Sequence, residues 1–280
     1  MANQMLGEQL SILVSSTDSY SDCWVPFFTL WHRYWQDNTC QIYLAAETKT
    51  QTFRDVDIVN YRDPEWAEVR PSWSELLTAT LKQIETPYVL YLQEDYFLCG
   101  TVPNAKLSAL VHWCVREKVD CLRLTDPFGL REKHSDALLA DMALRPVGKD
   151  FGYFASLQAA IWRKSWLQAL LDEPMSPWQF ERRSTLKAQM MDAKHWYVVG
   201  KSDIPQISSV FPYFPTGVVK GRWYEPAVVE LFHQHGIDVD YSRRGFYRPS
   251  YLDALKQRAR SGVRRSLMAF ALGRWICKKF

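Results

Sequence analysis

The chain has 280 residues, 47% of them hydrophobic and 23% charged, and its formal net charge is +3. These values are typical of one large globular domain or slightly more, and no apolar run is long enough to span a membrane. Residues 243–280 hold eleven lysines and arginines and one acid, so residues 1–242 carry −7, the difference between +3 and +10. The acidic body argues against nucleic acid as a partner, and the basic tail favours an anionic surface.

Strands are predicted, in chain order, at residues 11–15, 41–45, 56–60, 88–92, 120–124 and 159–162. Helical periodicity predicts helices near residues 24–35, 72–84, 103–118, 164–171, 177–194 and 226–235. Ser72 and Glu75 form a capping box at the start of the second of these helices. Residues 126–154 are expected to be a long loop with short helical pieces. The alternation predicts an α/β fold, with a mostly parallel central sheet and helices on both faces.

Six cysteines are spread along the chain, and none of them forms a CxxC pair: Cys23, Cys40, Cys99, Cys114, Cys121 and Cys277. Several of them lie in apolar runs, as buried thiols do. The first residues contain neither the basic nor the apolar segment of a secretory signal peptide. We therefore expect a reducing, cytoplasmic setting.

A polar loop follows the first predicted strand, at residues 15–22. Its hydroxyls, backbone amides and carboxylate can hold a nucleotide base and a ribose. Neither GxGxxG nor GxxxxGK[ST] is present, which excludes a Rossmann fingerprint and a P-loop. The alternative interpretation is that Asp18 or Ser19 only caps the next helix.

The predicted strand at residues 88–92 is aromatic and aliphatic and ends abruptly in Gln93, Glu94 and Asp95. Two adjacent acids at the end of a buried strand are costly unless they bind something. Ligands of open α/β sheets lie beyond the carboxyl ends of strands, so this segment, with Tyr96, is a candidate ligand site. A carboxylate here can hold Mg²⁺ or Mn²⁺ that bridges a donor diphosphate. The alternative is an ion pair or a helix cap.

Glu181 lies in the first turns of a later predicted helix, close in sequence to Trp178 and Phe180. A partly buried carboxylate in such surroundings suits a general base that takes a proton from an acceptor hydroxyl. The alternative is a carboxylate that interacts only with the positive helix N-terminus or with a neighbouring arginine.

Two further groups of polar residues lie late in the chain. Lys220 and Arg222 flank Gly221 and can neutralise a leaving diphosphate, the alternative being two solvated surface charges. His233 and His235 point about 200° apart on a helix, which argues against a paired metal site. One of the two histidines can still serve as a single metal ligand.

Taken in order, these motifs resemble those of bacterial GT-A-fold glycosyltransferases, of the kind found in polysaccharide and lipopolysaccharide assembly clusters. The resemblance covers most of residues 10–245 and is carried by residues 14–22, 24–28, 88–98, 156–164 and 176–181. It implies a GT-A-like catalytic domain in residues 1–245. The residues that follow, 246–280, are predicted from their own pattern to form a basic amphipathic helix. The resemblance further implies a hexosyltransferase that moves a sugar from a nucleoside-diphosphate donor, first of all a UDP-sugar, to a hydroxyl of a glycan or lipid-linked acceptor.

The resemblance also assigns roles at the donor. In GT-A enzymes the loop after the first strand holds the nucleotide, and that role falls here to Thr17, Asp18 and Tyr20. An Asp-x-Asp of the family holds the metal and the diphosphate, but Gln93 stands at the position of its first aspartate. Asp95 matches the second aspartate and is the expected ligand of Mg²⁺ or Mn²⁺, while metal independence is an open alternative.

The remaining roles concern the sugar and the chemical step. By resemblance, Ser156 and Gln158 line the sugar pocket, and Glu181 matches the base of inverting members. Lys220 and Arg222 are the alternative to a metal in neutralising the diphosphate. The implied reaction is a direct displacement in which Glu181 deprotonates the acceptor hydroxyl. Retaining chemistry is the open alternative, because the outcome depends on where Glu181 lies relative to the sugar.

The tail predicts where the protein works. From residue 250 onward, apolar residues recur at helical spacing among lysines and arginines. A basic amphipathic helix of this kind lies on an anionic leaflet, so we expect the protein at the inner face of the cell membrane. The alternatives are a helix packed on its own body, or a dimer contact. A protein of another class is also compatible with these features: a non-catalytic GT-A-like domain that binds glycan or scaffolds other enzymes.

Overall fold

The computed structural model describes residues 2–61, 66, 68–126, 137–139, 141–172, 174–199 and 208–248. They belong to two compact units, which are described separately below. The larger lies within residues 1–217 and 226–240, and the smaller within residues 218–225 and 241–280. The tail helix predicted from residue 250 lies outside the described residues, and the predicted domain boundary at residue 245 stays a prediction.

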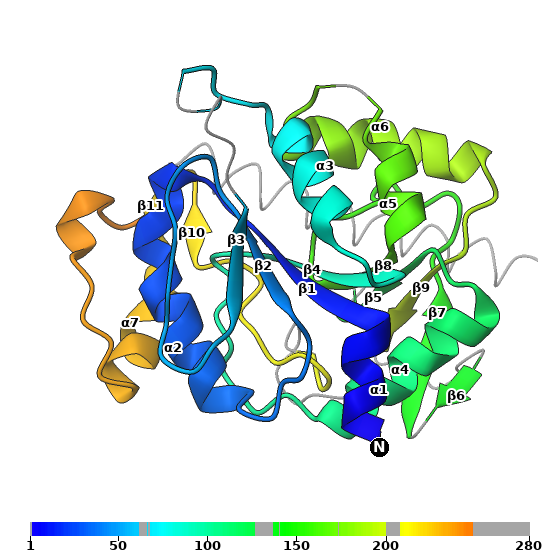
Figure 1. Ribbon diagram of the computed structural model, residues 1–280, viewed down its shortest axis with the longest axis horizontal. Helices are drawn as coiled ribbons and strands as arrows, with labels where there is room; N and C mark the ends of the chain where they lie inside the picture. The colour runs from blue at the N-terminus through cyan, green and yellow to red at the C-terminus, as the bar shows by residue number, and fades with distance from the viewer. Residues whose placement is uncertain are drawn as a thin grey trace, which may run out of the picture. The chain divides into compact units, whose positions relative to one another are not determined.

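The larger unit is built on a nine-stranded sheet of order β3-β2-β1-β4-β8-β5-β9-β7-β6 (Figure 1). Its strands are β1 (Leu10–Ser15), β2 (Ile42–Ala45), β3 (Ile58–Tyr61), β4 (Tyr88–Gln93), β5 (Cys121–Arg123), β6 (Ala137–Leu139), β7 (Met142–Pro146), β8 (Ala160–Arg163) and β9 (His195–Val198). Only β7 and β8 run against the direction of the other strands of this sheet. The other seven strands share one direction, which confirms the predicted mostly parallel sheet.

One face of the sheet is covered by three helices, α3 (Trp73–Gln83), α5 (Lys164–Leu170) and α6 (Pro177–Met190). Leu13, Tyr91 and Trp162 point to this face and form one buried cluster with apolar residues of all three helices. Both α3 and α6 begin with a capping box. That of α3 is the predicted pair, Ser72 and Glu75.

The opposite face is formed by the alternate residues of the same strands. There Tyr88 donates a 2.8 Å hydrogen bond to the carbonyl of Cys114 in α4 (Asn104–Glu117). α1 (Ala2–Gln9) packs against α4. Just after α2 (Trp24–Tyr34), the indole of Trp35 donates to Asn104. Helices therefore lie on both faces, as predicted. None of the helices within the described ranges combines the length and the apolar character needed to cross a membrane.

In the larger unit, three short strands and one helix were not predicted from the sequence. The expectation of a long loop over residues 126–154 was wrong, because β6 and β7 lie within it. β7 pairs with β9, which was missed too, since the helix expected to reach residue 194 ends at Met190. Strands of three to five residues near a sheet edge take their conformation from their partners more than from local pattern. The missed helix is α1.

The smaller unit contains a hairpin of two very short strands, β10 (Val218–Val219) and β11 (Arg222–Trp223). Its two turn residues, Lys220 and Gly221, both have positive φ, 51° and 75°. A two-residue turn of this kind matches the right-handed twist of paired strands. Trp223 exchanges backbone hydrogen bonds with Gly245 and Tyr247. α7 (Glu225–Gln234) follows the hairpin in the chain and ends near Gly236, whose φ is 60°.

A buried histidine ties β9 to α5. The Nδ1 atom of His195 lies 2.7 Å from the carbonyl oxygen of Phe154, and its Nε2 lies 3.1 Å from the indole nitrogen of Trp166. The carbonyl can only accept and the indole can only donate, so the ring is neutral with its proton on Nδ1. Burial lowers the pKa of His195 to about 4.

We predict that His195 makes the stability of the protein depend on pH. Its pKa in the folded protein is lower than about 6.5, the value expected in the unfolded chain, so the unfolded chain takes up the proton first. The stabilisation is complete above pH 6.5 and is lost as the pH falls towards 4, with a slope of about 1.4 kcal/mol per pH unit. Urea unfolding between pH 7 and pH 4.5 measures the change in the free energy of unfolding with pH. His195→Gln should flatten the slope, whereas His112→Gln, at an exposed position of α4, should not. Equal slopes for wild type and His195→Gln would contradict the assignment.

Candidate active site

The predicted site residues that belong to the larger unit gather at one edge of its sheet. Ser15 at the end of β1 pairs with Gln93 at the end of β4. Ala160, the first residue of the antiparallel β8, pairs with Tyr91 and with Arg123 at the end of β5. The segments that follow β1, β4 and β5 therefore meet the segment that precedes β8. This carboxyl edge is where open α/β sheets bind ligands.

The loop after β1 is held by Asp18. Its Oδ1 accepts from the backbone N–H groups of Thr48 and Lys49, at 3.1 and 3.0 Å, and its Oδ2 accepts from the Thr48 hydroxyl. Partial burial raises the pKa of Asp18, but the hydrogen bonds outweigh burial and the net pKa lies below the ordinary value. The carboxylate thus joins the loop after β1 to the loop after β2, instead of bonding to the start of the next helix.

The other two predicted nucleotide-binding residues lie in the same loop. Thr17 and Ser19 share a 2.6 Å hydrogen bond between their hydroxyls. The backbone N–H of Tyr20 donates to the carbonyl of Thr17, within the turn that begins the 3-10 helix at Asp18. Thr17, Asp18 and Tyr20 are thus brought together in one turn, and their contact with a nucleotide stays a prediction.

Glu47 is a buried acid of this region that the sequence analysis missed. It follows β2, accepts from the backbone N–H of Asp18, and bonds Arg70 through Nε and Nη2, both at 2.8 Å. Its signal was an acid just beyond a predicted strand, the same signal that indicated Glu94 and Asp95. Buried carboxylates therefore follow both β2 and β4, the strands that flank β1.

Asp95 holds a second loop at this edge. It is buried, as is Glu94, and its Oδ2 accepts from the hydroxyl of Thr216 at 3.0 Å and from the backbone N–H of Gly217 at 3.1 Å. A Cβ atom at Gly217 would lie 2.2 Å from the ring of Phe97, so this close approach requires glycine. Asp95 thus joins the segment after β4 to residues 216–217.

Glu181 faces the segment that precedes β8. Its Oε1 accepts from the backbone N–H of Leu157 at 2.9 Å and from the hydroxyl of Ser156 at 3.3 Å. One turn later on α6, Thr185 accepts from the backbone N–H of Ala155. The predicted aromatic surroundings were half right, because Phe180 is buried while Trp178 points into solvent.

Tyr96 connects the Asp95 loop to Glu181. The Tyr96 hydroxyl donates to the carbonyl of Leu157 at 2.9 Å. The backbone N–H of Leu157 in turn donates to Glu181. Burial raises the pKa of Tyr96 well above its ordinary value, so the phenol keeps its proton and remains a donor. The predicted base and the predicted diphosphate ligand therefore belong to one connected structure.

The predicted sugar-pocket residue Gln158 lies in the same network. Its amide oxygen accepts from the hydroxyl of Tyr213 at 2.8 Å, and the ring of Tyr213 lies 4.8 Å from that of Tyr96, between centroids. Ser156, the other predicted sugar-pocket residue, donates to Glu181. The sequence analysis missed Tyr213, which lies in a segment without clear periodicity.

Arg123 is a buried cation at the same edge that the sequence analysis also missed. Its Nη2 donates to the carbonyls of Tyr153 and Phe154, while its Nε is buried and bonds to no group among the described residues. Burial lowers the pKa of Arg123, and the nearby Cys121 and Glu181 oppose that shift. The available signal was a charged residue inside a predicted buried strand.

Lys220 and Arg222 belong to the smaller unit. Lys220 occupies the turn of the β10–β11 hairpin, with its Nζ 5.8 Å from the ring centroid of Tyr247, and Arg222 is exposed on β11. Their role at a donor diphosphate stays a prediction. In α7 and just beyond it, His233 is exposed and His235 bonds the hydroxyl of Tyr34, so the two do not act as a pair.

The described residues do not supply a full set of metal ligands. Within the described ranges, no group of three or more histidine, cysteine, aspartate or glutamate side chains could hold a metal ion. Asp95 gives one of its two carboxylate oxygens to Thr216 and Gly217. The described residues therefore do not by themselves fit a bound metal.

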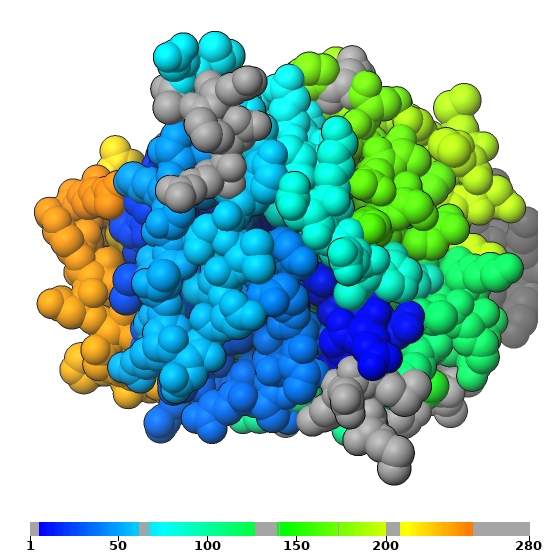
Figure 2. Space-filling view, in the orientation of Figure 1, coloured from blue at the N-terminus to red at the C-terminus, as the bar shows by residue number. Residues whose placement is uncertain are grey.

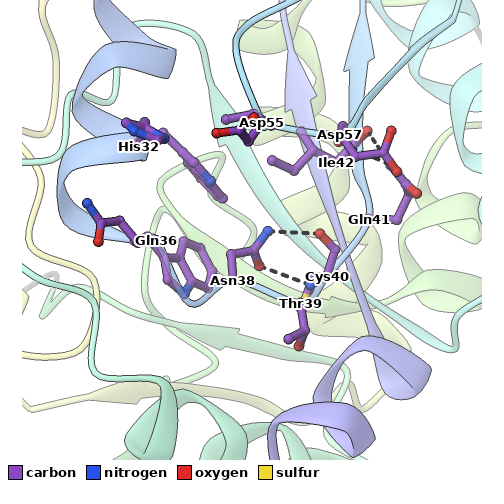
Figure 3. A pocket seen from close by; sticks show the side chains of 12 residues that line it. His32, Gln36, Asn38, Thr39, Cys40, Gln41, Ile42, Asp55 and Asp57 are labelled. Atoms are coloured by element: carbon purple, nitrogen blue, oxygen red, sulfur yellow. Dashed lines mark hydrogen bonds between the residues drawn. The ribbon is translucent and has the colours of Figure 1, made fainter.

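A separate hollow of about 480 Å³ lies near the start of β2, at the end of the strand opposite to Glu47. Figure 3 shows His32, Gln36, Asp55 and Asp57 around it. Two aspartates and no lysine or arginine line this hollow, so it is poorly suited to a diphosphate. Ile42, its contribution from the sheet, is the first residue of β2, so the hollow is not part of the carboxyl edge.

No protein-family model and no curated protein matches the sequence. The crystal structure of S. aureus TarS is 12% identical and covers 84% of this chain and 41% of its own, with a TM-score of 0.47. S. aureus TarS 1-349 in complex with UDP is 12% identical and covers 84% and 68%, with a TM-score of 0.45. The bifunctional IspDF from Campylobacter jejuni is 15% identical and covers 72% and 52%, with a TM-score of 0.37. This chain spans less than half of the TarS chain, and at these scores function has to be argued from the site itself.

We predict that the Asp95 loop tolerates no side chain at Gly217. Gly217→Ala places a methyl group against the buried Phe97 ring and should lower the free energy of unfolding by about 1–3 kcal/mol. Urea unfolding measures this change. Gly152→Ala is the matched control, because a Cβ there meets no atom within 4 Å, and it should change stability by no more than about 0.5 kcal/mol. Similar values for the two variants would show that the loop is not tightly packed.

Proposed function

We propose that the protein is a glycosyltransferase that moves a sugar from a nucleoside-diphosphate donor to a hydroxyl of a glycan or lipid-linked acceptor. One feature supports this most: the Asp95 loop and Glu181 are joined through Tyr96 and Leu157 at the carboxyl edge of the sheet. A donor binder and a proton acceptor held in fixed relation are what a displacement at a sugar carbon requires. UDP is the first expectation for the carrier, and cell-surface polysaccharide synthesis is the proposed setting.

The donor is proposed to lie across the ends of β1 and β4. Thr17, Asp18 and Tyr20 offer hydroxyls and backbone groups to the base and ribose. Glu94, the Thr216 hydroxyl and the backbone of the Asp95 loop are proposed to contact the diphosphate of the donor. Lys220 and Arg222 are proposed to neutralise the leaving group. Ser156 and Gln158, which precede β8, are proposed to line the place of the sugar.

The proposed step is a single displacement with inversion. The acceptor oxygen forms a bond to the anomeric carbon while the bond from that carbon to the diphosphate oxygen breaks. The nucleoside diphosphate leaves with the electron pair, and Glu181 takes the proton of the acceptor hydroxyl. The hydrogen bonds from Leu157 and Ser156 reach one oxygen of this carboxylate and orient it.

A divalent metal belongs to this proposal only as a companion of the donor. Mg²⁺ or Mn²⁺, when bound with the diphosphate, neutralises its charge, and Asp95 is the residue expected to meet it. Since the described residues hold no complete ligand set, such an ion would need the diphosphate and water as its other ligands. The alternative is a metal-independent enzyme in which Lys220 and Arg222 neutralise the diphosphate.

We predict that Glu181→Gln separates binding from chemistry. The amide oxygen still accepts from Leu157, so the fold and donor affinity should stay within about twofold of wild type. Transfer from UDP-hexoses should fall by about 10²–10⁴-fold, the usual contribution of a general base. Calorimetry with UDP and an assay of UDP release measure the two effects.

Glu117→Gln, at an exposed position of α4, is the matched control and should change neither quantity. Full transfer by the Glu181→Gln variant would remove Glu181 as the base. If wild-type protein binds neither UDP, GDP nor TDP at millimolar concentration and shows no transfer, the proposal fails. The non-catalytic glycan-binding or scaffold class would then be favoured.

We predict that Asp95→Asn weakens UDP binding by at least about tenfold. The change removes a buried charge and leaves the segment after β4 paired less well with Gly217. Calorimetry with and without Mn²⁺ measures it, and loss of Mn²⁺ enhancement in the variant places the ion at Asp95. Asp141→Asn, in an exposed pair with Lys106, is the control and should bind UDP as wild type does. Unchanged UDP affinity in Asp95→Asn would make Asp95 a structural residue only.

A further inference from the structure

One face of α6 is exposed and carries three large apolar side chains and two cations. The exposed fractions are 75% for Trp178, 65% for Leu186 and 87% for Met190, and Arg182 and Arg183 are exposed beside them. These five residues, which we call the α6 outer face, are all the exposed positions of the helix, and none is acidic. Figure 2 shows the yellow-green atoms of this part of the chain at the molecular surface, at the upper right.

The α6 outer face is a continuous stripe. Residues 178, 182, 186 and 190 follow one another at intervals of four, so their side chains line one side of the helix over about 18 Å. The inner side is formed by Phe180, Ser184, Thr185 and Ala188, which are buried. The inner side of α6 is therefore packed on the body. The outer face, which is apolar and basic, is not covered by the described residues.

The composition of this stripe selects its partner. A tryptophan, a leucine and a methionine on one side of a helix with arginines interleaved are typical of helices that lie in the interface of an anionic bilayer. The indole and the aliphatic groups enter the headgroup region, and the guanidinium groups meet lipid phosphates. Because residues 1–242 carry −7 overall, most of the body is repelled by an anionic leaflet and the basic stripe sets the orientation.

A second copy of the chain is the competing occupant, and charge argues against it. A symmetric dimer places the same surface patch on both sides of the interface. Two α6 outer faces brought together would place four arginines in one apolar contact without any acid from the stripe. Like charges brought face to face across an interface are costly. A surface of lipid phosphates supplies the anions that a second copy lacks.

We propose that the α6 outer face binds the surface of an anionic lipid bilayer. The inference rests on the proposed function for its purpose: Trp178 and Arg182 lie within three residues of Glu181, on the same helix. Binding through this face brings the membrane surface, and a hydroxyl carried on a membrane lipid, close to the helix that carries Glu181. The contact is independent of the tail predicted from residue 250 and adds a second attachment to the membrane.

Vesicle co-sedimentation of the full chain tests this proposal. Vesicles of phosphatidylcholine are compared with vesicles in which part of it is replaced by phosphatidylglycerol. Wild type should bind the anionic vesicles, and the triple variant Trp178→Ser, Leu186→Ser, Met190→Ser should lower the partition coefficient by at least about tenfold. Arg182→Gln with Arg183→Gln should reduce the preference for anionic lipid. Val69→Ser with Val115→Ser and Val229→Ser, three exposed apolar positions elsewhere, is the matched control and should bind as wild type does.

Several results would overturn the proposal. The proposal fails if wild type does not bind anionic vesicles. It also fails if wild type and the triple variant bind equally, because all binding then belongs to other parts of the chain. A dimer in light scattering that dissociates in the triple variant assigns the face to a second copy. Circular dichroism and urea unfolding verify that each variant is folded. UDP calorimetry without lipid is read separately, so failure of the glycosyltransferase proposal is distinguished from failure of membrane binding.

Discussion

The buried backbone that precedes β8 is the constraint on which this edge of the sheet depends. Buried carbonyl and N–H groups need hydrogen-bond partners, and β8 runs antiparallel, so its entry segment lies among the carboxyl ends of parallel strands. Side chains satisfy these groups: Arg123 and His195 at Phe154, Thr185 at Ala155, Tyr96 and Glu181 at Leu157. They come from β5, β9, α6 and the segment after β4. The residues proposed for chemistry therefore also hold the fold together.

Because the same side chains bond the backbone and are proposed for chemistry, their positions are fixed by the fold. Glu181 and Asp95 each spend hydrogen-bonding capacity on backbone N–H groups of the protein, which fixes the carboxylates before any ligand arrives. Fixed polar groups lose little entropy when a substrate binds and need little reorganisation during reaction. The same bonds make these residues costly to remove, so only near-isosteric replacements distinguish a chemical role from a structural one.

Much of the fold was predictable, because β1, β4 and the helices α3 and α4 carry strong periodic patterns or a capping box. The acids after β4 were predictable as a site because a charged group at the end of an apolar strand is costly without a partner. Arg123, Tyr213 and Glu47 were not recognised, since their partners are distant in sequence: Arg123 bonds Phe154, and Tyr213 bonds Gln158. The pairing of β7 with β9 was equally invisible, because strands this short depend on neighbours that local pattern does not identify.

The capped start of α6 determines how its outer face attaches to a surface. Ser176 and Gln179 form a reciprocal cap, Pro177 occupies the first turn, and Lys187 pairs with Asp172, so the helix is formed in the free protein. Peptides that become helical only at a surface lose backbone entropy on binding, whereas a preformed helix loses only side-chain freedom. Attachment through α6 is therefore rigid-body docking, with the angle between the body and the surface set by the packing of α6 on the sheet.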